Sequence, residues 1–568
     1  MDTFAALSSG KRLLVVGIDV LLQFGTTFSG LAWAETRRSD HQSVIETWPA
    51  SFGRQEGTSS EKVPTQLRYT QKGIEWGFQI PASVERFQWF KLGLANGDQS
   101  IVGDRARTSD GLTTDYLTEL VKHLMYTLEQ KIGNTTLETT PIEFCLTVPA
   151  IWSEAAKDKT LKACQAAGLK SKTEILLVSE PEAAAIYALQ GLDPHNLKIG
   201  DTFVLCDAGG GTVDLISYTI TALHPTIKVK EAAAGSGEVC GSTFLNRRFE
   251  TFLRDKLEKL PQWDEEILTD AMERFESVIK KQYLPSTFDQ DGYKVPVPGL
   301  PNNVKLGIRR AKLTVTPAEM QDIFEPIIGS VIKLVKNQIS ATKTTVKALL
   351  LVGGFGQNNY LKDRLSTSLP KSVIVMQPPN AWTAVVRGAV MMGLARANSN
   401  LAAVGLVSRV ARKHYGIELS ILFDHLLHDA SEVHWDTIEG NYRVAAMRWF
   451  IKKGDPVKEG QPIDIHCQQA YLVSKGRPQS LSIVVYCDDQ TATAPVHKTK
   501  NSRKLVILHA NLATLSQADL DKTIVTKMDL KDYYQICGSV QAVFSSASTK
   551  YMLLLQGKSY DTVTTEYA

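Results

Sequence analysis

The segment Asp207-Ala-Gly-Gly-Gly-Thr-Val-Asp214 decides the fold of this chain. An apolar run, residues 202–206, precedes it and a β-forming run, residues 215–220, follows it, so we expect a tight turn between two strands. Three consecutive glycines allow backbone N–H groups to approach an anion, and glycine tolerates the positive φ that such turns need. Most glycine runs are only flexible loops or hairpin turns, but the flanking strands and the two carboxylates favour a site for phosphate and hydrated Mg²⁺.

Two further stretches follow the same plan. Residues 13–18 form an apolar run that ends at Asp19 and is followed by the small-residue turn 25–30. Residues 348–352 form another apolar run, which leads into Gly353-Gly354. No helix-forming segment directly follows Gly211, so the pattern differs from a Walker loop and from a dinucleotide-binding turn. Two strand–turn–strand units that face each other would hold a phosphate chain from both sides.

This set of motifs, in this order and spacing, resembles the actin-like ATPase superfamily and, within it, the heat shock protein 70 family. The motifs that carry the resemblance are residues 17–19 with 25–29, 147–150, 179–185, 207–214 and 351–354. The resemblance implies an α/β fold: a two-lobed actin-like (ribonuclease H-like) ATPase domain over residues 11–395, with lobe I at about 11–199 and lobe II at about 200–395. It also implies that ATP or ADP and Mg²⁺ bind between the lobes.

The resemblance assigns roles to individual residues. The nucleotide phosphates would contact the first turn through Gly25, Thr26 and Thr27 and the second through Gly209, Gly210, Gly211 and Thr212. Mg²⁺ would lie near Asp19, Asp207 and Asp214, partly through water. The catalytic candidates are Asp214, Glu180, Lys91 and Thr212. Such a set suits phosphoryl transfer, which depends mainly on positioning and charge neutralisation.

Several of these residues also have plainer explanations. Lys91 follows the aromatic segment 87–90 and could reach the γ-phosphate, or its side chain could simply run along the aromatic rings. Glu276 and Lys280, four residues apart, fall where the family contacts the nucleoside, but this spacing also suits an ordinary ion pair on a helix face.

The glycines at 353 and 354 would let the backbone pass close to the adenosine. Phe355 and Gln357 stand where the family has a serine and an arginine, so stacking of that arginine on the base is not expected.

The first turn departs from the family pattern, because residues 20–24 separate Asp19 from Gly25 and four of them are extra. Asp19 could keep its position while the turn bulges. Alternatively, the strand could slide so that Gln23 takes the position of the aspartate, and a neutral glutamine would bind hydrated Mg²⁺ more weakly. A third explanation is an error in the gene model, in which case the transcript would lack the codons for these four residues. These alternatives decide whether the turn can still hold phosphate.

Composition narrows the class of protein. A chain of 568 residues is expected to form at least two domains. Lys plus Arg is 63 and Asp plus Glu is 60, so the balance predicts no nucleic-acid partner. Seven cysteines without a Cys-x-x-Cys pair indicate a reducing, cytoplasmic location, and the chain lacks the roughly 18 uninterrupted apolar residues of a membrane span.

Residues 405–568 are predicted to form a mostly-β domain, because short β-forming stretches alternate with Gly, Pro, Asp and Lys. We find no helical lid and no apolar-acidic linker of the family's type, as in divergent lidless relatives common in fungi. The family's peptide binding therefore does not transfer, and the protein client or adaptor stays unknown. The sequence predicts an ATP-binding, weakly ATP-hydrolysing chaperone-type protein with nucleotide-controlled lobe closure. A small-molecule (sugar-type) kinase and a pseudo-ATPase scaffold are the alternatives.

Overall fold

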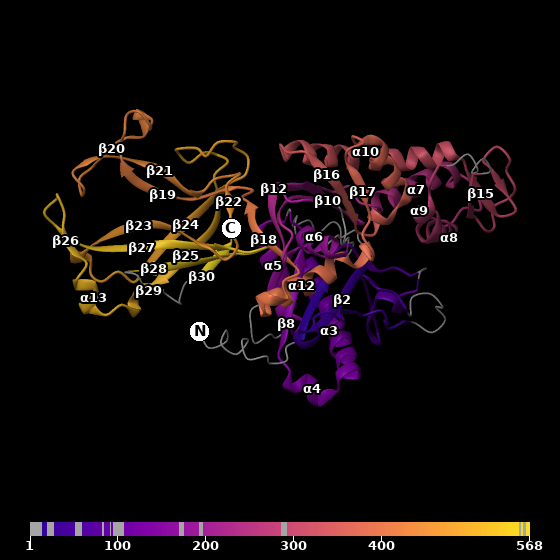
Figure 1. Ribbon diagram of the computed structural model, residues 1–568, viewed down its shortest axis with the longest axis horizontal. Helices are drawn as coiled ribbons and strands as arrows, with labels where there is room; N and C mark the ends of the chain where they lie inside the picture. Colours follow the sequence, from indigo (N-terminus) through magenta and orange to yellow (C-terminus); the bar gives the residue numbers. More distant parts are fainter. Residues whose placement is uncertain are drawn as a thin grey trace. The chain divides into compact units, whose positions relative to one another are not determined.

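The chain divides into two compact units, Met1–Gly405 and Leu406–Ala568 (Figure 1). The computed structural model describes residues 14–19, 28–50, 59–81, 84–90, 93–94, 107–150, 152–169, 175–191, 197–285, 292–555, 558–559 and 564–567. The first unit contains the strands of both strand–turn–strand motifs that the sequence singled out.

The first sheet of unit 1 has the strand order β3-β2-β1-β8-β9. Its members are β1 (Leu14–Asp19), β2 (Phe28–Glu35), β3 (Ser43–Val44), β8 (Ile142–Val148) and β9 (Leu176–Ser179). The central strand β1 pairs antiparallel with β2 and parallel with β8.

In the second sheet, five neighbouring strands repeat this plan in the order β17-β16-β10-β11-β12. These five are β10 (Thr202–Ala208), β11 (Val213–Ala222), β12 (Ile227–Glu238), β16 (Val346–Val352) and β17 (Ile374–Met376). The strand β10 pairs antiparallel with β11 and parallel with β16, and every residue of β10 is buried. Two sheets with the same local topology confirm the predicted α/β class of the ATPase-type domain.

A pair of helices, α6 (Glu180–Gly191) and α12 (Ala384–Ala397), lies between the two sheets (Figure 1). The helix α12 contacts β1 and β8, while α6 contacts β10 and β16. The two helices approach closely at Gly388, which has no side chain. A Cβ added there would collide with the carbonyl of Ala183. The sequence predicts a helix over 182–190, and the structure begins it two residues earlier, at Glu180.

The sequence predicts a helical arm over residues 241–283, and in the structure this arm is broken into several pieces. It consists of α7 (Thr243–Leu257), α8 (Glu265–Arg274), a π-helical turn (Phe275–Ile279) and α9 (Lys280–Gln282). The long helix α10 (Pro317–Ala341) covers them and begins at a capping box formed by Thr316 and Glu319. Phe249 and Phe275 stack with ring centres 4.0 Å apart, so the arm has an aromatic core.

The other elements of unit 1 are β4 (Val63–Pro64), β5 (Gln66–Thr70), β6 (Gly73–Trp76), β7 (Phe87–Gln88), α3 (Ser109–Ile132), α4 (Asn134–Thr139), α5 (Glu154–Ala166), β13 (Tyr293–Pro296), β14 (Ile308–Arg309), β15 (Lys312–Val315) and α11 (Asn359–Ser368). Across the residues that the structure describes, no helix is long and apolar enough to cross a membrane.

The second unit is built mainly from two sheets, with strand orders β20-β21-β19-β24-β25-β30 and β23-β27-β28-β29, and β26 also pairs with β27. Their bounds are β19 (His414–Leu422), β20 (His434–Asp436), β21 (Asn441–Ile451), β23 (Pro462–Leu472), β24 (Ser480–Asp488), β25 (Arg503–Asn511), β26 (Ile524–Thr526), β27 (Asp532–Phe544), β28 (Thr549–Leu555), β29 (Lys558–Ser559) and β30 (Thr564–Tyr567). Two further strands, β18 (Val404–Val410) and β22 (Pro456–Val457), pair with each other.

The apolar core of unit 2 lies between these sheets and includes Val485, Val506, Leu508, Val540 and Leu553. In the described part of the unit, the short α13 (Gln517–Asp521) is the one α-helix. The strand-rich domain predicted from the sequence is therefore confirmed. The sequence predicts a strand over 505–515, but the strand ends at Asn511. The side chain of Asn511 accepts a hydrogen bond from the amide of Ala513, and a 3₁₀ turn follows.

Candidate nucleotide site

The two aspartates of the glycine turn lie directly opposite each other. Asp207 lies near the carboxyl end of β10, where it pairs in register with Asp214 of β11. Opposite residues of an antiparallel pair point to the same face with Cβ atoms about 4.5–5.5 Å apart. Only 4% of Asp207 and 2% of Asp214 is exposed, so two carboxylates share one buried location beside the turn.

The turn itself is held by hydrogen bonds of two kinds. The amide of Gly209 donates to the carbonyl of Thr212 at 3.1 Å, and Thr212 Oγ1 donates to Asp214 Oδ2 at 2.6 Å. The amide of Gly209, which the sequence predicted as a phosphate donor, therefore closes the turn.

The start of α7 fixes the orientation of the three glycines. The carbonyl of Gly209 accepts a hydrogen bond from the amide of Ser242 at 3.1 Å. The carbonyl of Gly210 accepts one from the amide of Thr243 at 2.7 Å, and that of Gly211 accepts one from the amide of Gly241 at 2.8 Å. In a trans peptide unit the N–H points opposite to the C=O. The N–H groups that follow these carbonyls are thus directed away from α7.

Two glycines outside the turn allow this close packing. A Cβ added at Gly241 would lie 2.5 Å from the nitrogen of Gly211. A Cβ added at Gly353 would lie 2.5 Å from Asp207 Oδ1 and would also collide with the carbonyl of Ala208. Gly353 has φ of 86°, which favours glycine in any case. The structure thus brings the third predicted motif onto the second, and Gly241 is a contributor that the sequence reasoning missed.

Gly354 is exposed and lies beside an indole ring. A Cβ added there would lie 3.3 Å from Trp382 Nε1, and the Trp382 ring packs edge-on against Phe28 with ring centres 5.6 Å apart. Phe28 is the first residue of β2 and belongs to the first of the three motifs. Trp382 therefore contacts residues of two of the three motifs, although nothing in its local sequence marks it.

Glu276 and Lys280 form the ion pair that their spacing favours. Lys280 Nζ lies 3.1 Å from Glu276 Oε1 and 3.0 Å from Asn246 Oδ1, and Asn246 Nδ2 donates to Glu276 Oε2 at 2.7 Å. Burial opposes ionisation of Glu276, but the charge of Lys280 and the hydrogen bonds from Lys280 and Asn246 outweigh it and lower its pKa.

This group is linked to the glycine motif at 353–354, since Asn358 Nδ2 donates to the carbonyl of Lys280 at 2.7 Å. The contact of Glu276 and Lys280 with a nucleoside stays a prediction.

Glu180 is the first residue of α6 and is buried. Because α6 contacts both β10 and β11, Glu180 belongs to the helix that packs against the strands of the glycine turn. Asp19 ends β1, with its backbone opposite Gly30. The remaining predicted residues, Gly25, Thr26, Thr27 and Lys91, lie outside the described residues, as does the insertion at 20–24.

Two cysteines near the turn, Cys206 and Cys240, are buried close to carboxylates, and both have a raised pKa. Burial first, and then the charge of Asp207, holds the pKa of Cys206 well above its usual value. Burial, followed by the charges of Glu238 and Asp214, raises the pKa of Cys240 to about 12. Two buried carboxylates in such a place favour a cation.

Within the described residues, no group of three or more His, Cys, Asp and Glu is placed to hold a metal ion. Asp207 and Asp214 fit a Mg²⁺ ion that keeps several waters and shares ligands with phosphate, which is how this ion usually binds. The side chains and the glycine cradle therefore fit a magnesium–nucleotide group.

The two matched sheets, the helix pair between them and this turn define an Hsp70-like nucleotide-binding protein. A family model described as Hsp70 protein matches residues 96–419, more than half of the 568 residues. A second model, a domain of unknown function (DUF8568), matches residues 409–544. The chain belongs to the Hsp70 family.

Individual relatives agree with this assignment. Human heat shock 70 kDa protein 12A is 25% identical over 490 residues, which cover 69% of this chain and 71% of the relative. Human heat shock 70 kDa protein 12B is 23% identical over 475 residues, covering 66% and 68%. The chaperone protein DnaK of Akkermansia muciniphila is 26% identical over 272 residues, covering 47% and 39%.

Proposed function

We propose that this protein binds MgATP, hydrolyses it slowly and acts as a chaperone-type protein whose lobes close in response to nucleotide. The observation that carries the proposal is the position of Gly353 against Asp207 and Ala208, which seats the predicted adenosine motif on the predicted phosphate turn. Such an arrangement suits one ligand that extends across both motifs.

The side chains of the turn would divide the work. Asp207 and Asp214 would hold hydrated Mg²⁺, which when bound neutralises phosphate charge. Asp214 accepts a hydrogen bond from the hydroxyl of Thr212, so Thr212 Oγ1 is fixed beside the carboxylate that would orient the attacking water. Glu180 is the second candidate for that water. In this scheme hydrolysis needs position and charge, with no covalent intermediate on the protein.

Two alternatives follow from the sequence. The four extra residues between Asp19 and Gly25 favour a pseudo-ATPase scaffold that binds nucleotide weakly or without turnover. A sugar-type kinase of the same superfamily would instead use an aspartate as a base toward a hydroxyl substrate. Phosphate release without any acceptor supports the ATPase, whereas ATP consumption that begins only when a sugar is added supports the kinase.

The decisive experiment is calorimetric titration of the full chain with MgATP, followed by single-turnover hydrolysis. We expect saturable binding and slow phosphate release in the wild type, and neither in Asp207→Asn. The matched control is Asp201→Asn, because Asp201 accepts a hydrogen bond from the Lys198 amide at 2.8 Å and lies before β10, away from the turn.

Limited proteolysis with and without MgATP then tests closure. Nucleotide binding without hydrolysis would support the pseudo-ATPase scaffold. The same digestion pattern with and without nucleotide would show that the lobes do not close in response to it.

A further inference from the structure

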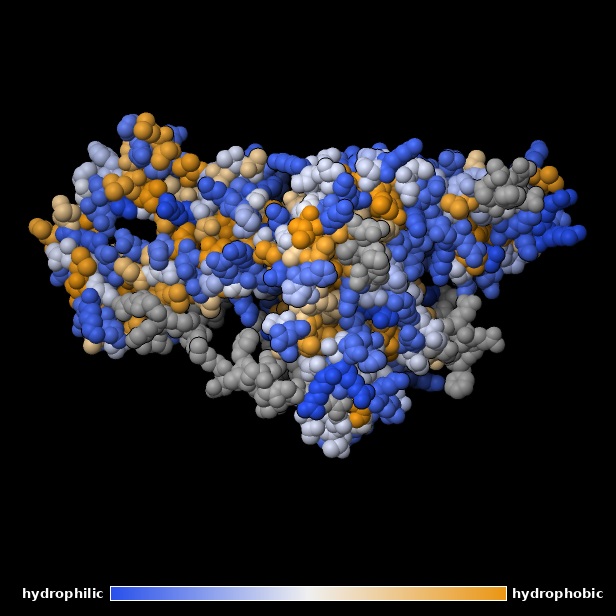
Figure 2. Space-filling model, viewed as in Figure 1, coloured by the Kyte–Doolittle hydropathy of each residue, from blue (hydrophilic) through white to orange (hydrophobic). Residues whose placement is uncertain are grey.

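The connection between β19 and β21 in unit 2 carries large apolar side chains on its surface. Leu426, Leu427, Trp435 and Tyr442 are 81%, 64%, 53% and 58% exposed. Trp435 lies opposite Tyr442 in the β20–β21 pair, with ring centres 4.9 Å apart and ring planes at 77°. Figure 2 shows apolar residues gathered over the part of the unit that carries β20. We call these four residues the hairpin surface.

The same stretch is strongly acidic. Residues 414–442 contain six carboxylates and neither lysine nor arginine. Three of the carboxylates pair with bases from elsewhere in the unit: Glu418 with Lys498 at 2.9 Å, Asp436 with Arg443 at 3.9 Å and Glu439 with Lys527 at 2.9 Å. The other three, Asp424, Asp429 and Glu432, all lie in the loop that carries Leu426 and Leu427.

These three loop carboxylates form no ion pair with a lysine or arginine among the described residues. Asp424 accepts a hydrogen bond from the amide of Leu426 at 2.9 Å, and Asp429 accepts from the amide of Ser431 at 2.9 Å. Hydrogen bonds from Ser431 lower the pKa of Asp429. The loop of the hairpin surface therefore carries three carboxylates that no described lysine or arginine pairs with.

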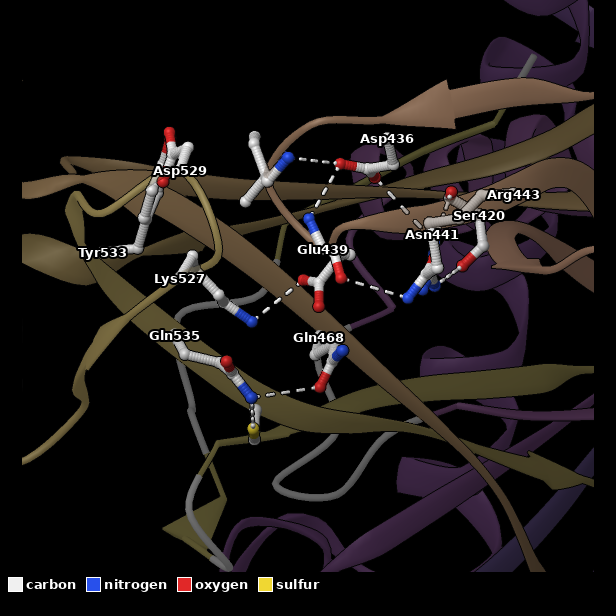
Figure 3. A network of polar contacts seen from close by, with 12 residues as sticks. Ser420, Asp436, Glu439, Asn441, Arg443, Gln468, Lys527, Asp529, Tyr533 and Gln535 are labelled. Carbon is white, nitrogen blue, oxygen red and sulfur yellow. Dashed lines mark hydrogen bonds and ion pairs between the residues drawn. The ribbon is translucent and has the colours of Figure 1, made fainter.

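Polar contacts hold the hairpin in one conformation (Figure 3). The carboxylate of Asp436 accepts hydrogen bonds from the amides of Ile438 and Glu439, at 2.9 and 3.1 Å. The amide of Met528 donates to the carbonyl of Ile438 at 3.1 Å, next to the ion pair of Lys527 with Glu439. Trp435 and Tyr442 are thus presented by a hairpin that these contacts hold in place, which lowers the entropic cost of binding a partner.

We propose that the hairpin surface binds a basic amphipathic segment of a partner protein. Exposed Trp and Tyr side chains are the residue types that dominate binding energy when a partner covers them. Lysine or arginine side chains on the partner would approach Asp424, Asp429 and Glu432, and this complementarity would speed association and select the partner. This role concerns unit 2 alone and does not depend on nucleotide binding.

Charge argues against two other occupants. A symmetric second copy would bring the same three carboxylates together, because a two-fold interface pairs the same patch with itself. An anionic lipid surface attracts basic segments and would repel this loop.

The binding test uses the full chain and two fluorescently labelled peptides, an amphipathic Leu/Lys peptide and the same peptide with Glu in place of Lys. Anisotropy titrations should show saturable binding of the Leu/Lys peptide and none of the Leu/Glu peptide. Raising the salt concentration well above physiological should weaken binding about tenfold, since exposed charges are screened.

Two variants separate the charged and apolar contributions. The triple variant D424N/D429N/E432Q should bind the Leu/Lys peptide about tenfold more weakly at low salt and lose most of the salt dependence. Leu427→Ser should weaken binding about tenfold at all salt concentrations and leaves strand pairing intact, because Leu427 lies in the loop. Val304→Ser is the matched control, an 82% exposed apolar residue of unit 1, and should change nothing.

Several results would overturn the proposal. They are failure of the Leu/Lys peptide to bind, equal binding of both peptides, or unchanged binding by both variants. Concentration-dependent self-association that Leu427→Ser abolishes would assign the surface to a second copy. Sedimentation with phosphatidylserine vesicles that Leu427→Ser abolishes would assign it to lipid.

Discussion

The guanidinium carbon of Arg247 lies 4.8 Å from the centre of the Trp89 ring, so α7 contacts the segment that follows β7. The same guanidinium lies 5.3 Å from the ring centre of Phe244, three residues earlier in α7. Trp89 has φ of 65°, a left-handed conformation that is costly for a bulky residue and persists only where neighbours hold it. The contact joins α7, which holds the glycine turn, to the segment whose sequence continues into Lys91.

Arg247→Ala should loosen this connection. Arg247 is exposed, and a cation–π contact at an exposed site contributes about 0.5–1 kcal/mol. We therefore expect a similar loss in the free energy of unfolding by denaturant titration. If the contact helps to close the nucleotide site, the dissociation constant for MgATP should rise about threefold. Arg247→Lys should retain part of the effect, because lysine keeps the charge but not the planar guanidinium.

Arg254→Ala is the control for this prediction. Arg254 lies on the same helix and pairs with Glu265 at 2.8 Å, away from Trp89. Equal nucleotide affinity in the two alanine variants would show that the Arg247–Trp89 contact has no part in closure.

Gly353→Ala should abolish nucleotide binding. The added Cβ would force apart β16 and Asp207, and the backbone conformation at φ of 86° is itself strained for alanine. The strain alone is expected to cost about 1–3 kcal/mol. Gly299→Ala is a matched control, since Gly299 has φ of 79° but no atom within 4 Å of its added Cβ. Thermal unfolding and MgATP titration of both variants separate the effect of backbone strain from that of the collision between the added Cβ and Asp207. Equal loss of MgATP binding in both variants would show that the collision is not the cause.

The glycine turn was predictable because its signals are local. Apolar runs before and after residues 207–214 encode the two strands, and the glycines between them encode the turn. Gly241, Asn246, Asn358 and Trp382 were not predictable, because each reaches the site only through packing of distant segments. Gly241 illustrates this: in sequence it only precedes a helix, whereas in the fold its missing side chain lets the turn rest on that helix.

Asp207→Asn should remove the stabilisation that MgATP gives to the wild type. A ligand at a hundred times its dissociation constant stabilises the folded state by about 2.7 kcal/mol, which is measurable as a rise in Tm. The asparagine keeps the shape of the side chain but removes one of the two buried charges that favour a cation. The variant should therefore show no Tm change on adding MgATP, while Asp201→Asn should respond like the wild type. A full response in Asp207→Asn would place the ion elsewhere.

The ion pair of Glu276 should make stability fall in acid. The pKa of Glu276 is lowered in the folded protein, so its contribution is complete above the unfolded pKa of about 4.3 and is lost as pH falls through the lower folded value. The difference in unfolding free energy between the wild type and Glu276→Gln should thus be constant above about pH 5.5 and shrink below it. Denaturant titrations between neutral and acidic pH measure this difference.

Lys280→Met tests the cause of this pH dependence. Lys280 Nζ lies 3.1 Å from Glu276 Oε1, and methionine keeps most of the side-chain length without the charge. In the Lys280→Met background, Glu276→Gln should have a smaller effect at neutral pH and little pH dependence, because the interaction that lowers the pKa is gone. Lys281→Met, one residue further along α9, is the comparison and should reduce the dependence less than Lys280→Met, because the charge of Lys281 lowers the pKa of Glu276 less than that of Lys280 does. If the pH profile is the same with methionine at 280 as with lysine, the hydrogen bond from Asn246 and the charge of Lys281, rather than the ion pair with Lys280, lower the pKa of Glu276.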